Sequence, residues 1–228
     1  MKKLTLALTV AAAVAAMPTA YGVGTMSLSD GGTTVTITDN GLGDSNPVIG
    51  AVTYVGAVGG NWLVNITTGL SKPVVGSATV PKMDLNSVNA TSGGAGTLTI
   101  KWSDDNFGPL GSESFQSSAG GTALAPGASV TVNTYGDTGN AIFGNDGTTA
   151  QSSQTFNSVP FAGAVAAPQG GPLPASYSLT MEAVIVHTAN GSSGFNAVLQ
   201  AVPDGGSTLM LFGSALGALG LLNWRRRK

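Results

Sequence analysis

Hydrophobic and hydroxyl-bearing residues alternate along several short runs of this 228-residue chain, and this period of two constrains its fold more than any other feature. Successive side chains of a β-strand point to opposite faces, so each run predicts a strand with one buried and one polar face. The runs are residues 33–38, 62–67, 97–102, 129–133 and 177–187. One parity of the last run holds Tyr177, Leu179, Met181, Ala183, Ile185 and His187. An all-β protein is therefore expected.

Turn-forming residues separate these runs. Asp-Gly and Asn-Gly steps, which tolerate positive φ and close tight turns, occur at Asp30-Gly31, Asn40-Gly41, Asp146-Gly147 and Asn190-Gly191. Short strands divided by such turns predict an antiparallel β-sandwich or jelly roll over residues 23–201. Residues 119–127 and the proline-rich residues 164–175 are expected to be longer loops.

The composition excludes several classes of site. The chain has no cysteine, so it has no disulfide, no thiolate nucleophile and no cysteine-based zinc site. Residues 23–202 hold three lysines against ten acidic residues, a formal charge of −7. Because phosphate backbones need Lys and Arg to displace their counterions, nucleic acid is not expected as a partner.

The N-terminus has the build of a secretory signal peptide, assigned to residues 1–22. Lys2 and Lys3 precede an apolar stretch, residues 4–16, and small residues follow around Pro18. Cleavage by signal peptidase could follow Ala16, Ala20 or Gly22. The small-residue rule does not decide among these three sites, and the region from Ala20 to Gly22 is favoured. The alternative is a short N-terminal anchor or a buried helix.

The C-terminus predicts a membrane segment. Residues 208–224 are uncharged, and 17 helical residues would extend about 26 Å, near the lower limit for crossing a bilayer core. The basic cluster Arg225, Arg226, Arg227 and Lys228 would hold the end of this transmembrane helix in the cytoplasm, with the β domain outside the inner membrane. Gly213 and Gly217 form a G-x-x-x-G that favours either helix association or a merely moderate hydrophobicity.

A short motif precedes the span: Val202, Pro203, Asp204, Gly205 and Gly206. This motif, the hydrophobic span and the arginine cluster together resemble the PEP-CTERM class of sorting signals, and most closely its VPDSG-CTERM variant. Gly205 stands where that variant usually has serine. The resemblance implies recognition of residues 202–206 by an exosortase-type membrane enzyme, in a bacterium that exports extracellular polysaccharide. It also implies an inner-membrane intermediate that is later released to the cell surface or the extracellular space.

No catalytic set is evident, so an enzyme is not expected. His187 is the sole histidine, nucleophile-elbow, zinc and phosphate-loop motifs are absent, and Glu113 with Glu182 is a weak candidate for a glycosidase pair. No cofactor is expected, with calcium as the one candidate. Its oxygen ligands would come from residues 137–140, 145–147 or 104–106, where Asp and Asn serve equally well as turn formers.

Two functions follow from this reading. A structural protein of the cell surface or biofilm matrix accounts for the sorting tail, the low charge and the lack of a catalytic set. The alternative is a secreted carbohydrate-binding module, in which Trp62 and Trp102 would stack on sugar rings. Both tryptophans share the parity of core residues in their runs, which argues against that use.

Overall fold

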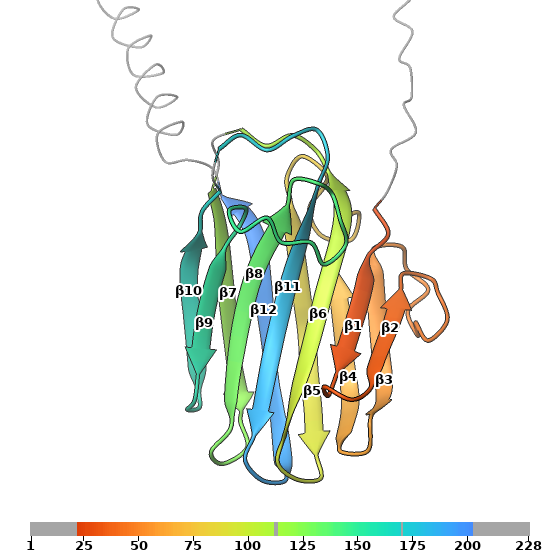
Figure 1. The fold of residues 1–228 in the computed structure, drawn as a ribbon, viewed down its shortest axis with the longest axis vertical. Helices are drawn as coiled ribbons and strands as arrows, with labels where there is room; N and C mark the ends of the chain where they lie inside the picture. The colour runs from red at the N-terminus through yellow and green to blue at the C-terminus, as the bar shows by residue number, and fades with distance from the viewer. Residues whose placement is uncertain (1–21, 112–113, 170, 203–228) are drawn as a thin grey trace, which may run out of the picture.

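Two six-stranded antiparallel sheets packed face to face form the protein in this computed structural model, which describes residues 22–202 except 112, 113 and 170 (Figure 1). Sheet A has the order β2-β1-β6-β11-β8-β9 and sheet B the order β10-β7-β12-β5-β4-β3. The strands are β1 (Thr25–Ser29), β2 (Thr34–Thr38), β3 (Ala51–Val58), β4 (Trp62–Leu70), β5 (Lys82–Ser92), β6 (Gly96–Phe107), β7 (Ser114–Ala123), β8 (Ser129–Asp137), β9 (Ser152–Phe156), β10 (Phe161–Ala167), β11 (Tyr177–His187) and β12 (Gly191–Val202). The all-β sandwich expected from the alternation is confirmed.

The core lies between the sheets and is built by the predicted alternation. On β11, Met181, Ala183 and Ile185 are fully buried, whereas Glu182 and Val184 between them are half-buried on the outer face. The same period places Trp102 of β6 at 0% exposure and Trp62 of β4 at 2%. Burial of apolar surface at about 25 cal/mol per Å² is the main force that holds the two sheets together.

Two segments expected to be loops are partly strands, so those two predictions were wrong in part. β7 continues to Ala123, and β10 runs from Phe161 to Ala167. Both stretches consist of small residues that show little hydrophobic alternation. β7 is nevertheless hydrogen-bonded on one side to β10 and on the other to β12, and this pairing outweighs weak local propensity.

The two ends of the described chain lie at the same end of the sandwich. β1 begins there, two residues after Val23, and β12 ends there at Val202 (Figure 1). Residues 22–202, apart from the gaps at 112–113 and 170, contain no helix able to span a membrane. The predicted signal helix and the predicted transmembrane helix, residues 208–224, lie outside the described residues.

Candidate functional site

The outer face of sheet B carries a groove that crosses β10, β7, β12 and β5, called here the sheet B groove. It consists of two adjoining hollows of about 470 and 560 Å³ that share Gly120 and Asn196. The lining residues are Ser87, Val88, Asn89, Ser118, Ala119, Gly120, Gly121, Thr122, Pro160, Phe161, Ala162, Gly163, Ala164, Gly194, Phe195, Asn196, Ala197 and Val198. None of these described residues is charged.

Small residues on neighbouring strands produce the groove. The strand register places Ala162 of β10 opposite Gly120 of β7, and Gly120 opposite Asn196 of β12. Gly120 has the outward parity of β7, because Ala119 before it points into the core. Because Gly120 has no side chain on this face, the surface is hollow at its position.

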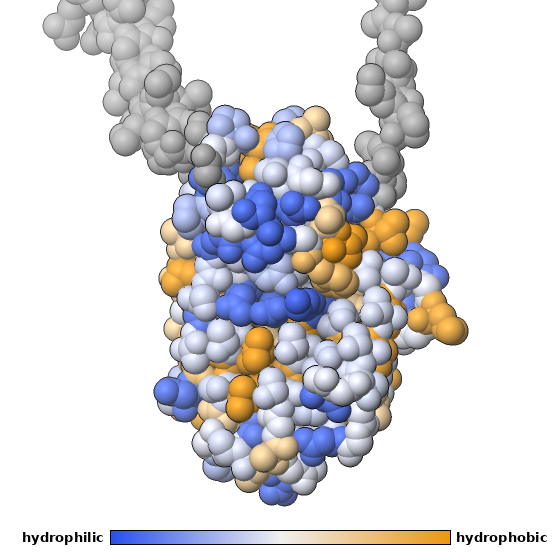
Figure 2. Space-filling view, viewed as in Figure 1, coloured by the Kyte–Doolittle hydropathy of each residue, from blue (hydrophilic) through white to orange (hydrophobic). Residues whose placement is uncertain are grey.

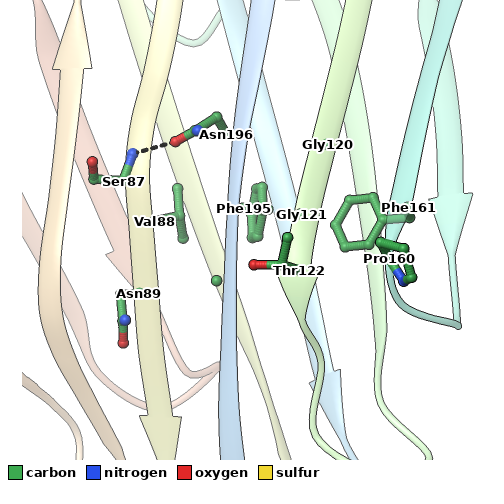
Figure 3. Close-up of a pocket in the computed structure, with 11 residues that line it drawn as sticks. Ser87, Val88, Asn89, Gly120, Gly121, Thr122, Pro160, Phe161, Phe195 and Asn196 are labelled. Atoms are coloured by element: carbon green, nitrogen blue, oxygen red, sulfur yellow. Dashed lines mark hydrogen bonds between the residues drawn. The ribbon is translucent and has the colours of Figure 1, made fainter.

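A β-bulge fixes the amide at the far side of the groove. Asn86 and Ser87 of β5 together oppose the single residue Asn196, and Ser87 has a positive φ of 54°. The backbone N–H of Ser87 donates to Oδ1 of Asn196 at 2.6 Å (Figure 3). The Nδ2 group of Asn196 has no hydrogen-bond partner among the described residues, so it remains a donor for a ligand.

The apolar part of the lining comes from two buried rings that belong to the hydrophobic core. Phe161 is 9% exposed and Phe195 3%, with ring centroids 6.5 Å apart. Phe161 reaches across the position of Gly121, where a Cβ atom would lie 2.6 Å from its Cζ. Figure 3 shows both rings beside Gly121 and Thr122. The groove thus offers amides, hydroxyls and a small apolar surface without charge, which suits a neutral, hydroxyl-rich ligand.

The outer face of sheet A carries the polar cluster that contains Glu182. Its Oε2 lies 3.1 Å from Nζ of Lys101, and its Oε1 accepts a hydrogen bond of 2.9 Å from Nδ2 of Asn133. Burial, and then the Glu182 charge, raise the pKa of Tyr135. A hollow of about 410 Å³ adjoins the cluster, on the face where Figure 2 shows hydrophilic surface gathering. Glu113, the sequence-predicted partner of Glu182, lies outside the described residues.

His187 lies inside the sandwich, not at its surface. Its Nδ1 and Nε2 atoms each lie 2.8 Å from a serine hydroxyl, that of Ser92 and that of Ser193 respectively. The indole of Trp62 packs 4.8 Å away, centroid to centroid. Burial lowers the pKa of His187, so the neutral imidazole is the form that the site accommodates. Both nitrogens are satisfied by hydroxyls, which makes this a structural contact.

The loop aspartates proposed as calcium ligands are engaged with their own backbone. Asp146 accepts hydrogen bonds from the N–H groups of Thr138, Thr148 and Thr149. Burial raises its pKa, but these bonds and the Thr149 hydroxyl outweigh that effect and lower it to about 2. Asp137 accepts from two backbone N–H groups. The described residues bring no three His, Cys, Asp or Glu side chains together, and calcium binding stays a prediction.

The sorting motif begins inside the sheet. Val202, its first residue, is the last residue of β12 and stands opposite Ser114 of β7. The N–H of Ala201 just before it donates to the carbonyl of Pro81 at 2.9 Å. Pro203, Asp204, Gly205 and Gly206, and the basic residues Arg225, Arg226, Arg227 and Lys228, lie outside the described residues.

Sequence reasoning missed the sheet B groove. Its floor is formed by β7 and β10, parts of which were expected to be the loops 119–127 and 164–175. The two tryptophans that were considered for sugar binding are buried in the core and cannot stack on a ligand. The outward parity of Gly120 would have been a usable signal only if β7 had been recognised as a strand.

Comparison with known proteins identifies the tail. Residues 201–228 match the family model of the VPDSG-CTERM motif, which confirms the resemblance seen in the sequence. No curated protein matches the chain.

Three solved structures resemble the sandwich at a distance. One is TmCBM61 in complex with beta-1,4-galactotriose, at 6% identity and a TM-score of 0.33, covering 63% of this chain and 88% of that one. Another is from the carbohydrate-binding modules of the beta-sandwich super family. Its sequence identity is 12% and its TM-score 0.35, and the match covers 79% of this chain and 73% of that one. A third is the enzymatically active domain of bacteriophage CBA120 tailspike protein 4. Its sequence identity is 10% and its TM-score 0.31, and the match covers 62% of this chain and 19% of that one.

Proposed function

We propose that this chain is an exported structural protein of the bacterial cell surface or extracellular matrix, sorted by an exosortase-type enzyme and without catalytic activity of its own. The observation that carries the proposal is the VPDSG-CTERM match over residues 201–228. Signal peptidase acts at the other end of the chain, and the inner membrane holds the chain between the two processing events.

The geometry of the sandwich supports this proposal. Val23 and Val202, which adjoin the two proposed membrane segments, lie at the same end of the molecule (Figure 1). The opposite end carries hairpin turns, among them those between β1 and β2, β5 and β6, and β11 and β12 (Figure 1). A chain held through its C-terminus would therefore direct these turns away from the membrane. The low charge of the surface and the hydrogen-bonded state of His187 and Glu182 also fit a role without catalysis.

Cell fractionation combined with mass spectrometry of the intact protein tests the proposal. The chain should be recovered from the cell surface or medium, with its N-terminus near Val23 and its C-terminus between residues 202 and 206. A surface product that still carries residues 207–228 would show that the tail is a membrane anchor only. Recovery of the full chain from the cytoplasm would contradict export altogether.

Binding of a neutral glycan is the second candidate function, and the sheet B groove is the observation that favours it. Sugar hydroxyls would pair with the free Nδ2 of Asn196 and with Thr122, and the Phe161 edge would contact the apolar face of a sugar ring. The absence of charge along the groove argues against charged polysaccharides as ligands. An exported protein with this groove would contact matrix polysaccharide directly.

Filling the groove tests this second function. A Cβ at Gly120 would have ordinary contacts, 3.4 Å to the carbonyl oxygen of Phe161 and 3.8 Å to Ala162, so Gly120→Val should fold and block the groove. Thr99→Val, on the outer face of sheet A, is the control. Affinity electrophoresis against neutral polysaccharides should show retardation that Gly120→Val abolishes and Thr99→Val preserves. Equal retardation of both variants would place binding elsewhere, and no retardation of the wild type would remove the candidate.

A further inference from the structure

Oxygen atoms converge on the chain where it enters the sandwich. A Cβ built on Gly22 would lie 2.7 Å from Oδ1 of Asp105, and closer still to Oδ1 of Asp104 and to the carbonyl oxygen of Asp105. The next backbone nitrogen, that of Val23, donates to Oδ1 of Asp105 at 3.1 Å. Three acceptor atoms, two of them from carboxylates, therefore surround the first described residues.

The positive charge in this cluster does not balance the negative charge. Nζ of Lys72 lies 2.7 Å from Oδ2 of Asp104 and also donates to the carbonyl oxygen of Asp105. Lys72 thus neutralises Asp104. Among the described residues, the carboxylate of Asp105 accepts from neutral donors only, the N–H of Val23 and Nδ2 of Asn106 at 3.2 Å. One more cation at this position would complete the cluster.

We infer that signal peptidase hydrolyses the Gly22–Val23 bond and that the α-ammonium group so formed on Val23 makes an ion pair with Asp105. The inference rests on the proposed export. Water adds across the amide, so that Gly22 leaves as a carboxylate with the signal peptide and the Val23 nitrogen becomes an ammonium group. This nitrogen already lies within hydrogen-bond distance of Asp105, so the pair needs no rearrangement.

Small residues around the bond agree with this position. Ala20 and Gly22 stand at the third and first positions before it, where signal peptidase requires small side chains. Cleavage after Ala20 instead would leave Tyr21 and Gly22 on the mature chain and move the ammonium group away from Asp105. It would also put the larger Pro18 at the third position before the cut. Among the sites that the small-residue rule allows, the charge of the cluster therefore favours the bond after Gly22.

The ion pair has a consequence for maturation. In the precursor, the Val23 nitrogen is an amide and gives Asp105 an uncharged donor, whereas in the processed chain it carries a full positive charge. In the precursor only the acceptor of this bond is charged, and the ammonium group adds a Coulomb attraction between two full charges. Removal of the signal peptide therefore strengthens the contact between the start of β1 and the end of β6.

N-terminal sequencing and labelling of the exported full-length protein test the inference. The exported chain should begin at Val23. Its α-amine should react several-fold more slowly with an amine-selective reagent than the α-amine of Asp105→Asn, because the ion pair holds it protonated. Asp30→Asn, which removes a charge at the opposite end, should react like the wild type.

A second measurement is independent of the variants. Val23 is 54% exposed, so salt should screen the ion pair and accelerate labelling of the wild type. A chain that begins at another residue, a labelling rate that does not change with salt, or equal rates for wild type and Asp105→Asn would each overturn the inference. A chain that stays in the cytoplasm with Met1 would overturn the proposed export as well, which separates the two failures.

Discussion

Gly69 of β4 lies directly against the indole of Trp102 of β6, so that the two sheets meet at this pair. A Cβ at Gly69 would lie 2.7 Å from Cε3 of Trp102, closer than real carbon atoms approach. Gly24, just before β1, contacts the other edge of the ring, where a Cβ would lie 3.1 Å from Cζ2. The indole Nε1 donates to the carbonyl oxygen of Leu70 at 3.1 Å, which satisfies the one polar atom of a fully buried side chain.

Substitution at Gly69 should therefore destabilise the fold. Gly69→Ala forces the Trp102 ring or β4 to move, and overpacking of this kind costs about 1–3 kcal/mol. Gly60→Ala is the matched control, because a Cβ there would meet nothing within 4 Å. Urea unfolding followed by tryptophan fluorescence should show a lower midpoint for Gly69→Ala and a change within about 0.5 kcal/mol for Gly60→Ala. Equal stability of the two variants would mean that the indole has room that the structure does not show.

The buried pair of Lys72 and Asp104 should behave as a coupled unit. The two side chains are 4% and 0% exposed, and Nζ of Lys72 also lies 3.9 Å above the ring of Phe107. Burial raises the pKa of Asp104, and the Lys72 charge opposes that rise. Lys72→Met should cost about 3–5 kcal/mol, because it leaves a buried carboxylate without its cation.

The double variant decides whether this cost belongs to the pair. Lys72→Met with Asp104→Asn should lose at least about 1 kcal/mol less than the sum of the two single variants. Urea unfolding of the three variants and the wild type gives this coupling directly. Additive losses would instead indicate that each side chain acts through other contacts.

The stability of the fold should fall in mild acid through His187. Its pKa is lowered by burial, so the folded state disfavours the proton that the unfolded chain accepts near pH 6.5. The contribution of the neutral imidazole is complete above about pH 6.5 and is lost as the pH falls toward the folded-state pKa. Thermal unfolding between pH 7.5 and pH 5 should show this loss in the wild type but a smaller one in His187→Gln. Parallel pH profiles of the wild type and His187→Gln would show that His187 does not cause the loss of stability in acid.

The sequence predicted the fold well wherever alternation was clear. The run that ends at His187 and the run around Trp102 are both strands, because β-branched and aromatic residues on one parity bury a continuous face. The strand β10 was missed because its Ala and Gly residues have little propensity of their own. Its conformation comes from pairing with β7, whose residues lie at least 40 positions away and whose register the sequence does not state.

The candidate sites also differ in whether the sequence alone predicts them. The sorting motif could be predicted because its information is local, in a few adjacent residues and their order. The sheet B groove could not, because it depends on Ala162, Gly120 and Asn196 meeting across three strands. The same holds for Asp105 and Val23, which are 82 positions apart and come together only in the folded sheet.

The motif and the basic cluster of the tail should have separable roles. Pro203→Ala with Asp204→Ala keeps the apolar span and its flanking charges but removes the groups that an exosortase-type enzyme would read, so the chain should be exported yet remain unprocessed in the inner membrane. Replacing Arg225, Arg226 and Arg227 by Ala removes charges that hold the C-terminal end of the span on the cytoplasmic side, and should weaken orientation and retention instead.

The position of Val202 limits where the enzyme can cut the chain. Because Val202 is paired with Ser114 in the sheet, an enzyme that needs an extended, unpaired substrate should act after it, and the mature C-terminus should keep β12 complete. Pro168→Ala, an exposed proline between β10 and β11, serves as the control and should be processed like the wild type. Intact-mass measurements on membrane and surface fractions give the outcome for each variant. A surface product of normal length from the Pro203 and Asp204 variant would show that the enzyme does not recognise the motif. A product that ends before Val202 would show that the last hydrogen-bonded residues of β12 separate from β7 during processing.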